Sequence, residues 1–124
     1  MARQRYRYAP VRVVYQDSER NIGVVLHAQR AGFFRLSTLS HGDLVRRLQD
    51  MSQEDVLHVE SVLTQMEMLG REAVDEPGLL DRLAALDPVV TLGAVHDAAT
   101  PDLNWSVFQH FTDFAHPQVA GADE

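Results

Sequence analysis

The chain contains neither cysteine nor lysine, and each absence excludes a class of chemistry. Without cysteine there are no disulfides, no thiol nucleophile and no thiolate metal site, which fits a protein of a reducing compartment. Without lysine there is no phosphate-binding P-loop, because that motif uses a lysine to reach the phosphates. All eleven basic residues are arginine. This is typical either of a GC-rich genome or of guanidinium groups selected for bidentate or stacking contacts.

Long apolar runs are missing as well. No stretch approaches the roughly 20 apolar residues that a membrane helix needs. The basic start of the chain leads into a strand pattern rather than into the apolar core of a signal peptide. We therefore expect a cytoplasmic protein that does not enter a membrane. Its 124 residues predict a single domain over 1–117, followed by a flexible acidic tail at 118–124.

The charges are distributed unevenly along the chain. Residues 1–47 carry nine arginines and three acids, whereas residues 48–124 carry two arginines and fifteen acids. The net charge of −7 therefore hides a basic first part and a strongly acidic second part. Such a division allows the two parts to attract each other within the fold or between subunits, and it allows a basic face to meet an acidic partner.

The first third of the chain predicts three strands. Segments 5–15, 21–27 and 33–38 are rich in β-branched and aromatic residues and are joined by short polar connections. Such short connections indicate an antiparallel meander. The apolar positions change phase near Pro10, which predicts a bulge or break there and favours an edge position for the first strand.

The remainder predicts helices and one more strand. A short helix is expected over 42–50, a long one over 53–69 that begins after the N-cap Ser52 and stops at Gly70, and a third within 79–86. A fourth strand is expected over 89–95, and a final helix over 101–115 with Thr100 as its N-cap. The predicted fold is thus an α+β domain: an N-terminal antiparallel β-meander with helices packed on one face, a fourth strand and a C-terminal helix.

No catalytic, metal-binding or cofactor-binding motif is recognisable. The six histidines form no His-x-x-x-His pair, and the glycines form neither a dinucleotide-binding loop nor a nucleophile elbow. We read His58 as part of a solvated helix face, and His110 with Asp113 as a surface pair. Paired acids such as Glu54-Asp55 lie at helix starts, where the helix dipole alone favours them. The sequence therefore predicts no catalytic residue, no metal and no cofactor.

An arginine–tyrosine run at the start of the chain is the one local pattern typical of nucleic-acid binding. Arg3, Arg5 and Arg7 alternate with Tyr6 and Tyr8. Aromatic platforms beside arginines bind single-stranded nucleic acids, but strand alternation places these arginines and tyrosines on opposite faces. The other interpretation is that the tyrosines pack inward and the arginines face water.

Two strand segments carry a resemblance to a known family. The segments are Tyr8-Ala9-Pro10-Val11-Arg12-Val13-Val14 and Asn21-Ile22-Gly23-Val24-Val25-Leu26, followed by the turn Gly32-Phe33 and by a helix with Arg46 or Arg47. Over residues 5–70 the chain resembles the bacterial proteins grouped as domain of unknown function 3037. The connection at 16–20 is shorter than is usual in that family, and 89–100 matches it poorly. The family brings no established activity, but its members are often encoded beside HipA-like kinases, which implies a protein partner.

Three functional hypotheses follow. The first is a non-enzymatic interaction or regulatory accessory protein, whose partner is a HipA-like kinase or a second copy of the chain. The second is a nucleic-acid-binding module built on the arginine–tyrosine strand, and the third is a small enzyme with an unrecognised site. If Arg12 points inward it needs an acidic partner, which the second part of the chain could supply. The candidate binding residues are Arg5, Arg7, Tyr8, Arg12, Asn21 and Gly23.

Overall fold

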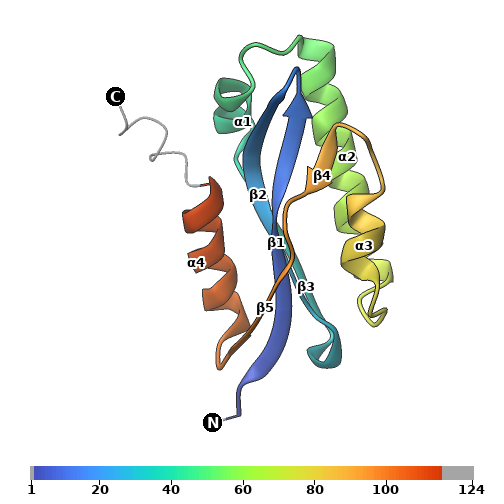
Figure 1. Ribbon diagram of the computed structural model, residues 1–124, viewed down its shortest axis with the longest axis vertical. Coiled ribbons are helices and arrows are strands. Elements are labelled where there is room, and N and C mark those ends of the chain that lie inside the picture. Colours follow the sequence, from blue (N-terminus) through green and yellow to red (C-terminus); the bar gives the residue numbers. More distant parts are fainter. Residues whose placement is uncertain (1, 116–124) are drawn as a thin grey trace.

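The computed structural model of the protein describes residues 2–115, which form one antiparallel sheet and four α-helices (Figure 1). Strands β1 (Gln4–Tyr15), β2 (Ser18–Ala28) and β3 (Phe33–Thr38) make the expected meander, with the short 3₁₀ turn η1 (Gln29–Ala31) between the last two. The β1–β2 hairpin is tight because Gln16 and Asp17 both adopt positive φ, as a type I′ turn requires. The predicted α+β class and N-terminal meander are confirmed.

Two further strands share the other side of β1. β4 (Val90–Leu92) pairs with the second half of β1, and β5 (His96–Thr100) pairs with the first half. The first strand is therefore central, and the expected edge position is wrong. Pro10 is tolerated there because it lies opposite the break between β4 and β5, where its carbonyl accepts a hydrogen bond from the N–H of Gly93 at 2.8 Å. A register shift does occur, one residue further on, between Val11 and Arg12.

Helices cover both faces of this sheet. α2 (Gln53–Glu72) and α3 (Leu79–Ala84) lie on one side, α4 (Leu103–Ala115) lies on the other, and α1 (His41–Arg47) sits beside β2 near the hairpin (Figure 1). The expectation that helices pack on one face holds for α2 and α3 but not for the C-terminal helix.

Both faces carry apolar residues, which explains this arrangement. Val11 and Val13 of β1 belong to the main core with α1, α2 and α3. Tyr6, Val24 and Leu26 belong to a second core with α4. The change of apolar phase in β1 thus marks a change from one buried face to the other, since side chains alternate along a strand.

The helix boundaries follow their caps. The hydroxyl of Ser52 accepts the N–H of Asp55 at 3.1 Å, so the predicted N-cap of α2 is confirmed. The predicted stop at Gly70 is wrong, because α2 runs on to Glu72. Gly70 is needed for a different reason: a Cβ at this position would overlap the ring of Phe34.

The last part of the chain differs most from expectation. The predicted fourth strand is shorter, and residues 96–100 form β5 rather than leading into a helix. α4 begins at Leu103, where Asp102 and not Thr100 accepts the N–H of Trp105, at 3.1 Å. The expected tail at 118–124 lies outside the described residues. No helix within 2–115 has the length and apolar character to cross a membrane.

Candidate functional site

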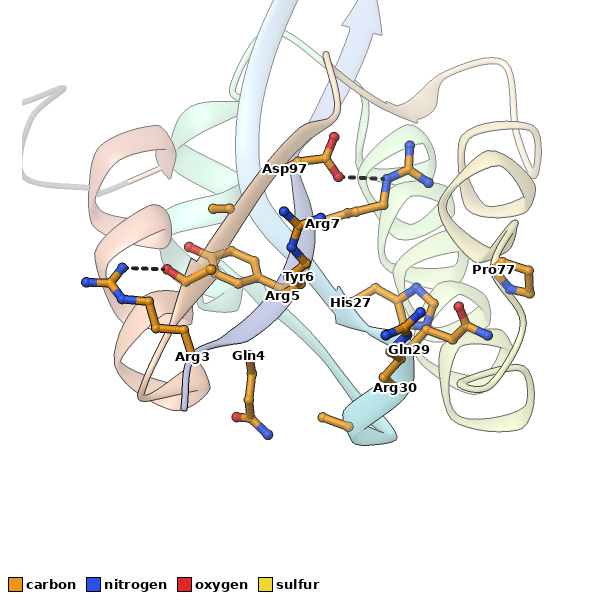
Figure 2. A pocket seen from close by; sticks show the side chains of 13 residues that line it. Arg3, Gln4, Arg5, Tyr6, Arg7, His27, Gln29, Arg30, Pro77 and Asp97 are labelled. Carbon is orange, nitrogen blue, oxygen red and sulfur yellow. Dashed lines mark hydrogen bonds and ion pairs between the residues drawn. The ribbon is translucent and has the colours of Figure 1, made fainter. Parts of the chain in front are cut away.

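A broad hollow opens beside the first half of β1. Its volume is about 950 Å³, and its walls come from β1, β5, the end of β2 with η1, and the loop between α2 and α3 (Figure 2). The lining consists of Arg3, Gln4, Arg5, Tyr6, Arg7, His27, Gln29, Arg30, Ala31, Pro77, Asp97, Ala98 and Ala99.

Four arginines supply most of the charge in this hollow. Arg5 and Arg7 occupy alternate positions of β1, so their side chains leave the backbone on one face, and Arg3 directly precedes the strand. Figure 2 shows Arg7 extending toward the side where Arg30 lies, and Arg3 turned in the opposite direction. There the Arg3 guanidinium donates to the carbonyl of Ala99 at 3.5 Å.

Carboxylates do not balance these cations. Arg7 pairs with Asp97 at 3.7 Å, but the Asp97 side chain is 86% exposed, so water screens the pair. Within residues 2–115, no carboxylate oxygen lies within 4.0 Å of a side-chain nitrogen of Arg3, Arg5 or Arg30. Five other arginines each form a carboxylate pair elsewhere in the fold: Arg12, Arg20, Arg46, Arg71 and Arg82. The hollow therefore has an excess of positive charge in a protein that is acidic overall.

The wall opposite β1 is held by two hydrogen bonds. The Nε2–H of His27, a residue only 3% exposed, donates to the carbonyl of Val74 at 2.6 Å. The amide of Gln29 donates to the carbonyl of Asp75 at 2.9 Å. These bonds tie the α2–α3 loop to the end of β2 and to η1.

Tyr8, a predicted site residue, lies on the other face of the sheet. Its ring stacks on His110 of α4, with centroids 3.7 Å apart. Burial raises the pKa of Tyr8, and the nearby Tyr6 and Asp113 raise it further. The Tyr6 hydroxyl is hydrogen-bonded to Nε2 of His110 at 2.8 Å. The tyrosines of the arginine–tyrosine run therefore hold α4, and Tyr6 also borders the hollow.

Arg12 and Asn21 meet near the opposite end of β1. The Nε–H of Arg12 donates to Oδ1 of Asn21 at 3.1 Å, and its Nη1 donates to Glu19 at 3.2 Å. With 34% of its side chain exposed, Arg12 takes its acidic partner from β2 and not from the second part of the chain. Neither Arg12 nor Asn21 lines the hollow.

Gly23 allows two backbones to approach closely. A Cβ at Gly23 would collide with the carbonyl oxygen of Ser37 in β3. This position thus serves the packing of β2 against β3. Of the six predicted site residues, the structure brings Arg5 and Arg7 together in the hollow and places the other four elsewhere.

The sequence interpretation missed Arg30 and Gln29, which follow β2 in η1. The signal that could have found them is the meander itself, because the β1–β2 register sets Arg7 opposite His27. With this register, the residues after β2 lie alongside the start of β1.

The chemistry available in the hollow is anion recognition. Guanidinium groups stay protonated and donate bidentate hydrogen bonds to carboxylates and phosphates. Among the described residues, no three histidine, aspartate or glutamate side chains are close enough to hold a metal ion.

A scan of the chain against protein-family models finds no match, and no curated protein or solved structure is significantly similar to it. The resemblance to domain of unknown function 3037 therefore stays a prediction, and the function has to be argued from the site.

Proposed function

We propose that this protein is a non-catalytic binding module that takes an acidic segment of a protein partner into the arginine-lined hollow. The observation that carries the proposal is the set of arginines without carboxylate neighbours: Arg3, Arg5 and Arg30 beside the weakly paired Arg7. Protein surfaces with such uncompensated charge attract and orient partners of the opposite sign.

A protein partner is favoured over a nucleic acid for two reasons. Single-strand binding uses exposed aromatic rings for stacking, but Tyr6 is buried and Tyr8 is stacked on His110. The net charge of −7 also repels a long polyanion, whereas a short acidic segment meets only the local basic region. The nucleic-acid module is thus the weaker candidate.

The same proposal gives this protein a role as an accessory or regulatory subunit. An accessory or regulatory subunit needs a docking surface and no catalytic machinery, and the hollow supplies such a surface. The family resemblance suggests a HipA-like kinase as partner, and self-association is the other option.

The test is a comparison of two labelled probes by fluorescence anisotropy at low and physiological ionic strength. One probe is an oligoglutamate peptide and the other a length-matched oligothymidylate. We expect the peptide to bind at low salt and to weaken as salt screens the charges. The double variant Arg5→Glu/Arg30→Glu should lose this binding.

The matched control is Arg35→Glu/Arg46→Glu, which makes the same change in net charge at two exposed arginines outside the hollow. This variant should keep most of the binding. Equal losses in the two variants would mean that only net charge matters, and the proposal would be wrong. Tighter binding of oligothymidylate than of the peptide would favour the nucleic-acid module.

A further inference from the structure

The backbone of β1 alternates between its two neighbours, and two hydrogen bonds fix which residues face which side. The carbonyl of Pro10 accepts from Gly93, and the N–H of Val14 donates to Val89, each at 2.8 Å. Even-numbered residues of β1 therefore direct their backbone groups toward β4 and β5, since polar groups alternate along an antiparallel strand. By this alternation the backbone N–H and C=O groups of Gln4, Tyr6 and Tyr8 point toward β5.

The pairing register then shows which residues of β5 direct their backbone groups toward β1 and which direct them away. The partners of these three residues are Thr100, Ala98 and His96, so these three bond to β1. The residues between them, Asp97 and Ala99, must direct their N–H and C=O groups away from β1. The contact from Arg3 to the carbonyl of Ala99 agrees, because that oxygen is left available to a side chain.

Except for the contact from Arg3 to the carbonyl of Ala99, this outer edge of β5 is unpaired within the described residues. Within residues 2–115 the sheet has the order β3-β2-β1-β4, and β5 is paired with β1 alone. α4 packs on the face of the sheet, against β2 above all. Unpaired edges of this kind are templates for an added strand.

The open edge and the arginines belong to one surface. Asp97, Ala98 and Ala99 line the same hollow as Arg5 and Arg7. In the register, Arg5 stands opposite Ala99 and Arg7 opposite Asp97. An extended chain laid along β5 would turn every second side chain toward the face that carries these arginines.

We infer that the acidic partner docks as an extended strand on the outer edge of β5, with its backbone bonded to Asp97 and Ala99 and alternate carboxylates directed at the arginines. This inference rests on the proposed function and adds to it the conformation of the partner. A compact anion, or a helix held by its side chains alone, would use the arginines but leave the edge free.

The test uses the oligoglutamate peptide together with a version N-methylated at every residue, which has the same charge but no backbone N–H. Strand addition predicts about tenfold or more weaker binding of the methylated peptide, as expected for one or two lost hydrogen bonds. Amide exchange followed by NMR should show the amides of Asp97 and Ala99 exchanging rapidly in the free protein and slowly when the peptide is bound. The amide of Ala98, bonded to β1, should be slow in both states.

The protein variant Ala99→Pro removes one outward N–H without touching the bonds to β1, a position where edge strands tolerate proline. Its fold is checked by its circular dichroism and unfolding midpoint. We expect native folding with peptide binding weakened about tenfold.

The outcomes separate the two proposals. If the unmodified peptide does not bind at all, the proposed function is wrong. If it binds but both amides stay fast and the methylated peptide binds equally well, only the strand inference is wrong. Protection of Asp97 and Ala99 that appears without peptide and grows with protein concentration would show a second copy on this edge and would also overturn the inference.

Discussion

The imidazole of His110 lies face to face with the ring of Tyr8, with the ring centroids 3.7 Å apart and the planes inclined by 13°. Tyr6 adds a hydrogen bond of 2.8 Å from the same strand to the same imidazole. One histidine of the last helix is thus held by two tyrosines of the first strand. Burial lowers the pKa of His110, Asp113 opposes this shift, and His96 adds to it.

This environment predicts a loss of stability at mildly acidic pH. An unfolded histidine titrates near pH 6.5, and in the folded protein the pKa of His110 is lower. Below about pH 6.5 the unfolded chain therefore binds more protons, and the free energy of unfolding falls as the pH drops, until the folded pKa is passed. Urea unfolding at a series of pH values measures this dependence.

The variant His110→Phe isolates the contribution of His110 to this pH dependence, because phenylalanine keeps an aromatic ring and cannot titrate. The other histidines stay the same in both proteins. The free energy of unfolding of the variant should change less with pH in this window than that of the parent protein. Identical pH dependence in the two proteins would contradict the assignment.

Gly70→Ala is expected to destabilise the protein although alanine is the better helix former. Alanine gains about 1 kcal/mol over glycine inside a helix. Here its methyl group would overlap the ring of Phe34, and overpacking of this kind costs about 1–3 kcal/mol. We expect a net loss that shrinks in the background Phe34→Leu, where the ring is absent. Chemical denaturation of the four proteins of this double-mutant cycle tests the coupling.

Gly70 also shows why a helix end could be misjudged from sequence. Glycine is the usual residue after a helix, and a pattern along the chain cannot reveal that Phe34 of β3 occupies the space above it. Ser52 could be predicted because a cap is a local event, made by a hydroxyl and an N–H three residues away. Local signals predicted the meander and the start of α2, whereas long-range packing decided where α2 ends.

The same distinction applies to the site. Arg5 and Arg7 could be predicted to share a face, because alternation is a property of one strand. The strand β5 could not be predicted, since His96-Asp97-Ala98-Ala99-Thr100 has low β propensity and is held by its pairing with β1. Without β5, the sequence could not show that residues 96–100 form a wall of the hollow or that Asp97 contributes its carboxylate.

Asp87 links α3, β4 and α2, and its removal should cost stability. One carboxylate oxygen accepts the N–H groups of Val89 and Val90 at 2.9 and 3.2 Å, and the other is 2.8 Å from Nε2 of His58. Asp87→Ala should lose about 1–2 kcal/mol, as for other capping side chains. His58→Ala should lose less than about 1 kcal/mol, because the histidine side chain is 52% exposed and Asp87 keeps its backbone bonds.

Acid should reduce the difference in stability between the parent protein and Asp87→Ala. Burial alone would raise the pKa of Asp87, but the bonds from Val89, Val90 and His58 outweigh it and hold the pKa below the usual range. The part of its contribution that depends on ionisation is therefore complete above the unfolded value of about 3.9 and is lost as the pH falls through the folded pKa. Unfolding midpoints that stay equally far apart from pH 7 to strongly acidic pH would rule out this role.

Asp97→Asn should strengthen the binding of an acidic segment. Asp97 is the one carboxylate among the described lining residues of the hollow, and it partly neutralises Arg7 at 3.7 Å. An asparagine keeps the size of the side chain and removes the negative charge that would repel an incoming carboxylate. Because the pair is exposed, the fold should lose less than about 1 kcal/mol.

The measurement is the salt dependence of oligoglutamate binding to the parent protein, to Asp97→Asn and to Asp81→Asn. Asp81 is an exposed acid of α3 outside the lining, so its variant makes the same change in net charge. At low salt we expect a clear gain for Asp97→Asn, a small gain for Asp81→Asn, and convergence of all three as salt screens the charges. Equal gains would mean that the peptide senses only the overall charge. A loss for Asp97→Asn would mean that Arg7 must be held by Asp97 before it can bind, so the pair would be a positioning element of the site.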